Sequence, residues 1–174
     1  TSEKTELVLS EILSGEADPS QISAFLIALK VKGETTEEII GLVRAMLNAS
    51  EPLSLPENSI DIVGTGGSLQ RREAALNVST MASFVAAASG AVVCKHGNRR
   101  ASSTSGAFDL LDALGLPVDQ TPLEVAEQVK SKNLGFAFAK TFHPAMRFAG
   151  PVRAGIGVPT VFNILGPLSH PGRI

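Results

Sequence analysis

Asp61-Ile62-Val63-Gly64-Thr65-Gly66-Gly67 is the stretch of sequence that decides the fold. An apolar run of β type passes directly into a glycine cluster, and Asn77-Val78-Ser79-Thr80 then opens a helical segment. Because glycine lacks a Cβ atom, backbone N–H groups in such a turn can approach an anion closely, and a helix start adds unpaired N–H donors. The spacing is neither Gly-x-Gly-x-x-Gly nor that of a P-loop, which disfavours dinucleotide and ATP binding. The stretch predicts a strand-to-helix turn that binds phosphate, and a glycine turn with a purely structural role is an equal alternative.

This turn belongs to a longer alternation of strand-like and helical segments. The strand before the glycines is expected at residues 60–63, and further β-type runs at 91–94 and 135–139. Helical patterns separate the runs at residues 81–89, 110–114 and 122–131. Alternation on this scale predicts βαβ crossovers, so we expect an α/β fold with the first part of a mostly parallel sheet.

Upstream of the glycine turn the chain reads as a small helical domain. Apolar residues recur at helical spacing over residues 5–14 and 20–31, and a third apolar stripe follows near residues 39–47. Asp18 with Gln21, and Thr35 with Glu38, have the spacing of capping boxes. We therefore expect a helical domain at 1–58, a partial α/β domain at 59–142, and a helical segment and hinge at 143–174 that returns to the helical domain.

A second polar loop follows the second predicted strand. Lys95-His96-Gly97-Asn98-Arg99-Arg100-Ala101-Ser102-Ser103-Thr104-Ser105-Gly106 brings cations, an imidazole, an amide and hydroxyls together before a helix. Ligands of open α/β sheets bind at the carboxyl ends of the strands. Two such loops after successive strands predict one shared anion site, although a solvated polar loop remains the alternative reading.

Composition limits the other possibilities. The chain has 174 residues and a formal net charge of −2, so its overall charge gives it no attraction for nucleic acid or anionic membrane. A single cysteine excludes an internal disulfide framework, and no apolar stretch is long enough to span a bilayer. We expect a cytoplasmic protein. His143 has no second histidine at helical spacing, and we expect it to be an interior or capping residue.

Several motifs, in this order, resemble those of the anthranilate phosphoribosyltransferases. The shared strings are Val63-Gly64-Thr65-Gly66-Gly67, Asn77-Val78-Ser79-Thr80, Lys95-His96-Gly97-Asn98-Arg99, Ser102-Ser103, Ser105-Gly106, His143-Pro144-Ala145-Met146 and Val161-Phe162-Asn163-Ile164-Leu165-Gly166-Pro167-Leu168. Pyrimidine nucleoside phosphorylases are similar in architecture, but the lysine–histidine–glycine–asparagine and asparagine-to-proline strings favour the former family. The resemblance implies transfer of the phosphoribosyl group of phosphoribosyl pyrophosphate to the amine of anthranilate, in tryptophan biosynthesis.

The resemblance also implies which residues bind the substrates. The expected phosphoribosyl pyrophosphate contacts are Gly64, Gly67, Ser68, Asn77, Val78, Ser79, Thr80, Lys95, His96, Gly97, Asn98, Arg99, Ser102, Ser103 and Ala107. The expected anthranilate contacts are Gly64, Asn98, Arg153, Gly166 and Pro167, with Arg153 attracting the carboxylate. Ser79 would bind Mg²⁺. We assign no acid or base catalyst, because the amine is a neutral nucleophile and pyrophosphate leaves readily once its charge is neutralised.

The chain departs from the family pattern in the first loop and in length. Ser68 stands where the family usually has aspartate, Ala75 where it has threonine, and the loop between them is longer. We hypothesise that Arg71 or Arg72 compensates by contacting phosphate; a solvent-facing arginine pair is an equal alternative. Family members are about twice this length, so we expect an N-terminal fragment that is impaired alone and that lacks the acidic second-metal pair.

Other readings remain open for the acceptor and the assembly. The altered loop would also allow a phosphoribosyltransferase for a different aromatic acceptor, and a non-catalytic nucleic-acid-binding relative is a further alternative. The resemblance implies a homodimer through the helical domain.

Overall fold

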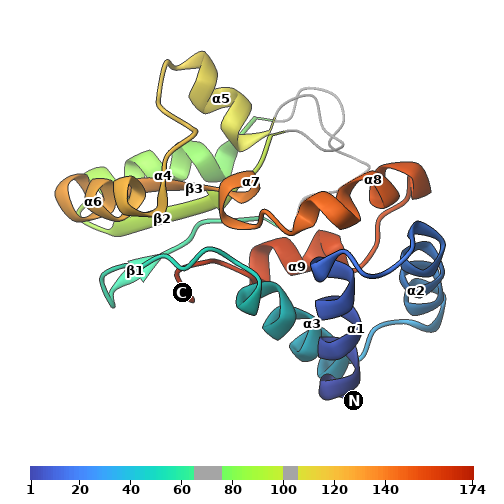
Figure 1. Ribbon diagram of the computed structural model, residues 1–174. Coiled ribbons are helices and arrows are strands. Elements are labelled where there is room, and N and C mark those ends of the chain that lie inside the picture. The colour runs from blue at the N-terminus through green and yellow to red at the C-terminus, as the bar shows by residue number, and fades with distance from the viewer. Residues whose placement is uncertain (65–75, 100–105) are drawn as a thin grey trace. The chain divides into compact units, whose positions relative to one another are not determined.

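The computed structural model describes residues 1–64, 76–99 and 106–174, which form two compact units. Unit 1 consists of Thr1–Ser50 and His143–Ser169, and unit 2 of Glu51–Phe142 and His170–Ile174. The helical segment after the third strand therefore joins the N-terminal helices, as the sequence predicts (Figure 1). Each unit has its own hydrophobic core and is described by itself.

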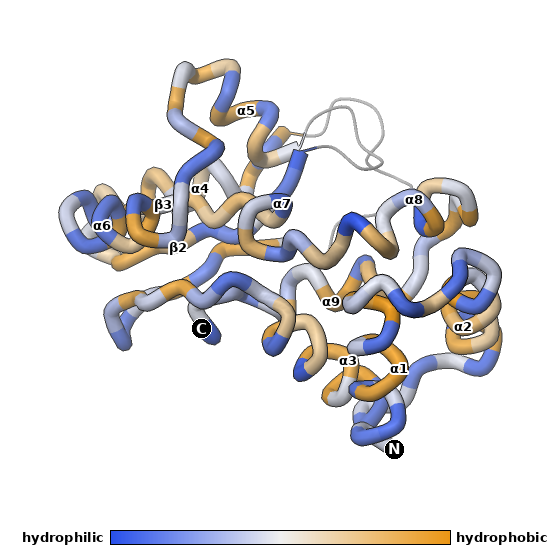
Figure 2. The backbone as a smooth tube through the Cα atoms, viewed as in Figure 1, coloured by the Kyte–Doolittle hydropathy of each residue, from blue (hydrophilic) through white to orange (hydrophobic). Residues whose placement is uncertain are grey.

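Unit 1 is helical throughout its regular structure. Its helices are α1 (Ser2–Ser14), α2 (Pro19–Lys32), α3 (Thr36–Asn48), α8 (Met146–Ile156) and α9 (Phe162–Leu168). Its core combines residues from both ends of the chain, with Leu9, Leu26 and Leu42 from the N-terminal helices against Ala149 and Leu165. The hydrophobic and hydrophilic residues that alternate along α1 and α3 are visible in Figure 2.

Local capping explains where these helices begin. The Asp18 N–H donates to Gln21 Oε1 at 2.8 Å before α2. At α3 the Thr35 N–H donates to Glu38 Oε2 at 2.9 Å, and the Glu38 N–H donates to Thr35 Oγ1 at 3.3 Å. Both predicted capping boxes are thus present, and they satisfy N–H groups that have no partner within the helix.

Helices α1 and α3 meet at a glycine. Gly41 is buried, and a Cβ atom placed on it would overlap the Ser2 carbonyl group and the Thr5 hydroxyl of α1. Thr5 Oγ1 donates across the contact to the Glu38 carbonyl at 3.1 Å. Glycine is required here because the two backbones pack more closely than any side chain allows.

Unit 2 contains a parallel sheet with the order β1-β2-β3, which confirms the predicted α/β class. Its elements are β1 (Ser59–Ile60), α4 (Val78–Ala88), β2 (Val92–Gly97), α5 (Ala107–Ala113), α6 (Pro122–Lys132), β3 (Leu134–Phe138) and α7 (Ala139–Phe142). Helices alternate with the strands along the chain, as parallel pairing requires.

The sheet is covered on both faces. Cys94 and Ala137 face Val125 and Val129 of α6, whereas Phe136 and Phe138 face Phe108 of α5 on the opposite side. Phe84 of α4 packs against this second face, with its ring 5.5 Å from that of Phe136. Successive strand residues thus contribute to different cores, the alternation that a doubly covered strand requires.

The structure corrects two predicted boundaries. The first strand ends at Ile60 and not at Val63, and β2 continues to Gly97, so Lys95 and His96 are strand residues that the sequence placed in a loop. Gly166 and Pro167, which are expected to contact anthranilate, lie in the last turn of α9. Proline fits there because its fixed φ is helical and only one hydrogen bond is lost near the helix end.

His143 is an interior residue of unit 1, as predicted, and it should make stability sensitive to acid. Burial lowers the pKa of His143 to about 4, opposed by a hydrogen bond with the Ser169 backbone. Because the folded-state pKa lies below the unfolded value, the stabilisation is complete above about pH 6.5 and is lost as the pH falls toward 4. We expect the wild type to lose up to about 3 kcal/mol more than His143→Gln over this range.

Urea denaturation of both proteins at several pH values measures this difference, and carboxylates that titrate in both proteins cancel. Parallel stability curves for the two proteins between pH 7.5 and 4 would contradict the assignment.

Candidate functional site

The predicted donor-site residues that the structure describes gather at one edge of the unit 2 sheet. Gly64 lies exposed beyond the end of β1, the Asn77–Thr80 segment begins α4, and Lys95 to Arg99 span the end of β2. Ala107 begins α5. The carboxyl ends of parallel strands and the N-termini of the following helices share this edge, where ligands of α/β proteins bind.

The start of α4 provides backbone donors and hydroxyl groups. The first N–H groups of a helix have no partner within it, and the helix dipole makes this end favourable for an anion. Ser79 is half-buried in the first turn, while Thr80 is fully buried and its Oγ1 has no hydrogen-bond partner among the described residues. Val78 is exposed, so it can contribute to a ligand site mainly through its backbone.

Lys95 lies inside the unit. Its side chain is 2% exposed, and its Nζ donates to the Ile62 carbonyl at 2.8 Å. The neighbouring Asp61 accepts the His96 backbone N–H on Oδ1 at 3.2 Å. Asp61 Oδ2 is buried and has no hydrogen-bond partner in the described part of the chain.

Burial shifts the pKa values of both of these charged groups. It raises the pKa of Asp61 to about 6, although the charge of Lys95 and the hydrogen bonds from His96 and Ile62 oppose the shift. Burial also lowers the pKa of Lys95, and the charge of Asp61 opposes that shift. A buried pair of this kind is retained for position rather than for stability in many proteins.

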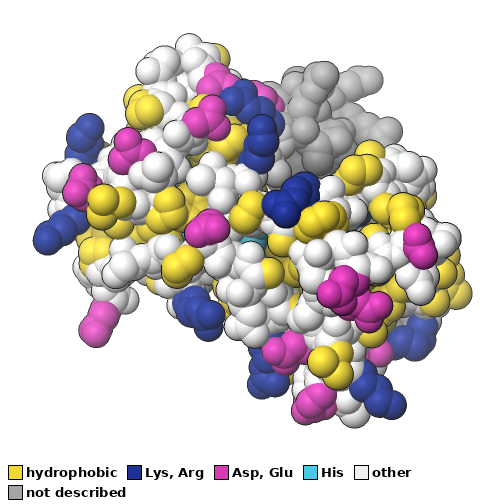
Figure 3. Space-filling view, in the orientation of Figure 1, with side chains coloured by type: hydrophobic (Ala, Val, Ile, Leu, Met, Phe, Trp, Pro, Cys, Tyr) yellow, Lys and Arg dark blue, Asp and Glu magenta, His cyan; other side chains and the backbone are white. Residues whose placement is uncertain are grey.

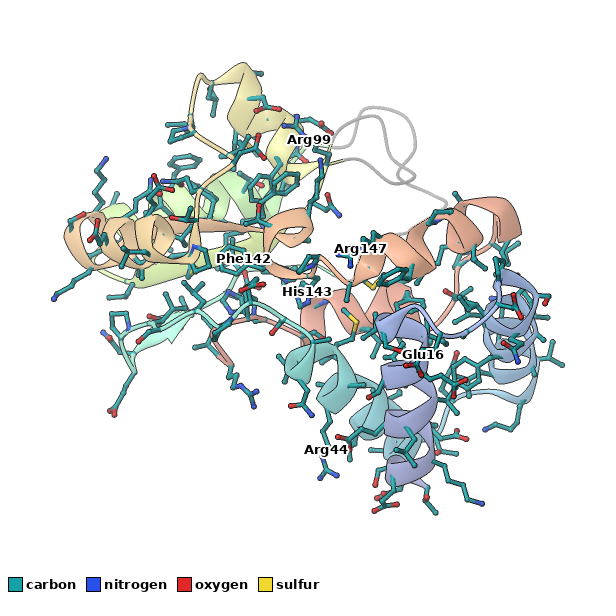
Figure 4. All side chains as sticks on the ribbon, viewed as in Figure 1. Glu16, Arg44, Arg99, Phe142, His143 and Arg147 are labelled. Atoms are coloured by element: carbon teal, nitrogen blue, oxygen red, sulfur yellow. The ribbon has the colours of Figure 1, made fainter. Side chains whose placement is uncertain are left out.

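Arg99 is held against α5. Its guanidinium forms an ion pair with Asp112 and lies 5.5 Å from the centre of the Phe138 ring (Figure 4). Phe138 in turn stacks on Phe108 at 4.6 Å between ring centres. A guanidinium has five N–H donors, so one ion pair leaves donors for a phosphate group.

Gly97 brings β2 and α5 close together. A Cβ atom on it would lie 3.3 Å from Ala107 Cβ and 3.4 Å from Phe108 Cε2. The Phe108 N–H donates to the Asn98 carbonyl at 3.3 Å, so the exposed Asn98 is fixed relative to the start of α5. A side chain at position 97 would push these elements apart.

The predicted anthranilate residues fall in both units. Gly64 and Asn98 belong to unit 2, whereas Arg153 of α8 and Gly166 and Pro167 of α9 belong to unit 1. Arg153 is half-buried, and its guanidinium lies 4.9 Å from the centre of the Phe162 ring. No carboxylate forms an ion pair with it in residues 1–64, 76–99 and 106–174.

Four of the predicted phosphate-binding residues lie outside the described residues, and so do the two arginines suggested as compensating groups. They are Gly67, Ser68, Ser102, Ser103, Arg71 and Arg72.

Sequence reasoning missed three side chains that organise this edge of the sheet. Asp61 enters the sequence analysis only as the first residue of the stretch that leads into the glycine turn, and neither Asp112 nor His170 is singled out there. His170 Nδ1 accepts the Gly172 N–H at 3.0 Å, so its Nε2 carries the proton and donates to the Cys94 carbonyl at 2.9 Å. A charged residue inside an apolar strand run was the one available signal, and it pointed to Asp61.

Two other kinds of feature are absent from the described part of the chain. Across the described ranges, no group of three or more His, Cys, Asp or Glu residues is placed to hold a metal ion. None of the helices in those ranges is both long and apolar enough to cross a membrane. Acidic and basic side chains are interspersed on the face seen in Figure 3.

The fold and the edge described above define a class: α/β proteins with a helical bundle and with polar segments at the carboxyl ends of parallel strands. Residues 56–174 match the α/β domain of the glycosyl transferase family, and residues 1–50 match its helical bundle domain. The chain belongs to this glycosyl transferase family.

Named relatives are anthranilate phosphoribosyltransferases. The chain is 51% identical to that of Rhodococcus jostii over 98% of its own length and 46% of the relative's. The crystal structure of the Thermus thermophilus enzyme superimposes with a TM-score of 0.92 at 45% identity, covering 98% of this chain and 51% of that one. The Saccharomyces cerevisiae enzyme in complex with PRPP and Mg gives 0.87 at 34% identity, with 98% and 51% covered. The chain spans about half the length of the relatives it matches.

Proposed function

We propose that the protein transfers the phosphoribosyl group of phosphoribosyl pyrophosphate to the amine of anthranilate. The products would be N-(5-phosphoribosyl)anthranilate and pyrophosphate, a step of tryptophan biosynthesis. The observation that carries the proposal is the edge of the unit 2 sheet, where the start of α4 and the Asn98-Arg99 segment lie at the carboxyl ends of β1 and β2. The relatives named above carry the same activity in their names.

The donor would bind through the α4 start and the second loop. Backbone N–H groups of Val78 to Thr80 would receive phosphate oxygens, and Asn98 and Arg99 would add side-chain donors. The ammonium of Lys95 binds the Ile62 carbonyl in the interior, so we assign Lys95 a supporting role in place of a direct phosphate contact. His96 is also buried and would act in the same indirect way.

Mg²⁺ is the cofactor we propose, with Ser79 as a ligand. The Ser79 hydroxyl is a hard oxygen donor in the half-buried first turn of α4, which suits a metal that keeps several waters and shares phosphate oxygens with few protein ligands. When bound, the ion would neutralise the charge that develops on pyrophosphate as it leaves. The chain itself would orient the donor at the sheet edge.

The acceptor would bind through Arg153. A half-buried guanidinium stacked on Phe162, with no carboxylate partner in the described residues, suits the carboxylate of anthranilate. Burial lowers the pKa of Arg153, yet a guanidinium stays charged throughout the physiological range. The face of the Phe162 ring attracts the guanidinium and favours its position in α8.

We also propose a homodimer through the helical unit. Leu7 of α1 is 70% exposed and Val31 of α2 is 81% exposed. Large apolar side chains exposed on helices are the kind of surface that protein interfaces cover.

A product assay tests the proposed function. We expect the protein, made at the length its gene encodes, to convert anthranilate, phosphoribosyl pyrophosphate and Mg²⁺ into N-(5-phosphoribosyl)anthranilate, detected by mass spectrometry. A parallel reaction with benzoate, which lacks the amine, should give no ribosylated product. If anthranilate is not consumed and another aromatic amine is ribosylated in its place, the alternative acceptor would replace anthranilate in this proposal.

A further inference from the structure

The sheet of unit 2 opens between β1 and β2 at the point where the first loop departs. β2 pairs with β3 as far as Gly97, but β1 pairs with β2 only through Ser59↔Val92 and Ile60↔Val93. The Val93 N–H donates to Asn133, on the β3 side, so the N–H groups of Cys94 and His96 point toward β1. Had the ladder continued, the His96 N–H would bind the Ile62 carbonyl, and the Cys94 carbonyl would accept the Ile62 N–H.

Side chains take the places of those ladder bonds. The His96 N–H goes to Asp61 Oδ1, and the Ile62 carbonyl accepts from Lys95 Nζ. The Cys94 carbonyl accepts from His170 Nε2. Side chains thus satisfy three of the backbone groups that the missing ladder leaves behind, and beyond Ile60 and Val93 no backbone bond joins the two strands in the described residues.

We propose that Asp61, Lys95 and His170 form a strut that holds the starts of the two anion-binding loops at a fixed spacing, and that Asp61 is a positioning residue for the donor site. Gly64 lies three residues beyond Asp61, and Asn98 lies two residues beyond His96. Without the strut, β1 could continue to pair with β2, which would draw the first loop toward the second. This inference rests on the proposed function, because it names the site that the strut serves.

Three features favour a strut over a simple buried ion pair. Asp61 binds a backbone N–H, Lys95 binds a backbone carbonyl, and no direct Asp61–Lys95 salt bridge is present in the described residues. Both charged groups are removed from water, and the free-energy cost of burying charges often exceeds the gain from their attraction. Their presence here therefore favours a role in positioning over a role in stability. The His170 ring also lies edge-on to that of His96, with 5.6 Å between ring centres, and supports β2 at the same level.

The test compares two replacements of Asp61 whose side chains branch at Cγ as that of aspartate does. Asn keeps the oxygen that accepts the His96 N–H, whereas Leu cannot accept a hydrogen bond. In the full-length protein we expect Asp61→Leu to raise the Kd for phosphoribosyl pyrophosphate with Mg²⁺ by about 10-fold or more, as measured by calorimetry. A change of this size corresponds to roughly one hydrogen bond to a charged group. Asp61→Asn should stay within about threefold of wild type, and so should Asp119→Asn, an exposed carboxylate of the same unit.

Amide hydrogen exchange reports on the strut without any ligand. The His96 N–H should exchange at least about tenfold faster in Asp61→Leu than in Asp61→Asn, because its acceptor is gone. Failure of the wild type to bind phosphoribosyl pyrophosphate would refute the proposed function but leave this measurement standing. Equal His96 exchange in the two variants, or equal Kd values in them when the wild type binds, would overturn the strut. Asp61→Ala takes the place of Asp61→Leu if the larger side chain prevents folding.

Discussion

Gly41→Ala is expected to destabilise unit 1 by about 3 kcal/mol. The added methyl group would overlap the Ser2 carbonyl group and the Thr5 hydroxyl, so α1 and α3 must move apart. That movement would break the hydrogen bond from Thr5 Oγ1 to the Glu38 carbonyl and loosen the leucine core between the helices. Neighbouring backbone cannot yield as the end of a flexible side chain can, which places this substitution among the most damaging single changes.

Urea denaturation followed by circular dichroism measures the loss, and Gly155→Ala is the matched control. Gly155 lies in α8 of the same unit, and a Cβ atom there would have no heavy atom within 4 Å. Alanine is a better helix former than glycine, so the control should be neutral or slightly stabilising. A loss for Gly41→Ala no larger than that of the control would show that α1 and α3 are not in close contact.

Arg153→Gln is expected to raise the KM for anthranilate by about 10- to 100-fold in the full-length protein. A hydrogen bond between a guanidinium and a carboxylate contributes about 1.5–3 kcal/mol, and glutamine removes the charge. The KM for phosphoribosyl pyrophosphate should change by less than about threefold, since the residues proposed to bind this substrate lie at the unit 2 sheet edge. The KM of Arg153→Lys for anthranilate should fall between those of the wild type and Arg153→Gln, because lysine keeps the charge but lacks the planar guanidinium.

Steady-state kinetics with each substrate varied in turn separates these effects. Arg44→Gln is the control, because Arg44 is an exposed arginine of α3 in the same unit (Figure 4). An Arg153→Gln enzyme with an unchanged KM for anthranilate would remove Arg153 from the acceptor site, and the half-buried guanidinium would then serve only to cover Phe162.

Local patterns in the sequence were sufficient for most of the fold. The capping residues before α2 and α3 specify helix starts through bonds within four residues, and the helices and strands of unit 2 follow from apolar periodicity. The parallel pairing of the strands and the return of residues after His143 to the helical unit also agree with expectation. These features depend on interactions that are short in sequence or on general rules of chain connection.

The features that could not be predicted depend on contacts distant in sequence. The end of β1 at Ile60 has one local signal, the charged Asp61, but Lys95 and His170, which bind the backbone groups left unpaired there, lie far along the chain. For the same reason a lysine in a polar string was assigned to a phosphate, although its ammonium is enclosed within the unit. The role of Gly41 likewise appears only when α1 is packed against it.

The division of unit 1 between the two ends of the chain has a consequence for its synthesis. Its core needs Ala149, Val161 and Leu165 beside the leucines of the first three helices. While the ribosome is still making residues 51–142, those leucines have no complete core, and the nascent helices must wait until α8 and α9 have been made. Pairings this distant in sequence slow folding, so α1 to α3 would reach their native packing only after the later-made α8 and α9 join them.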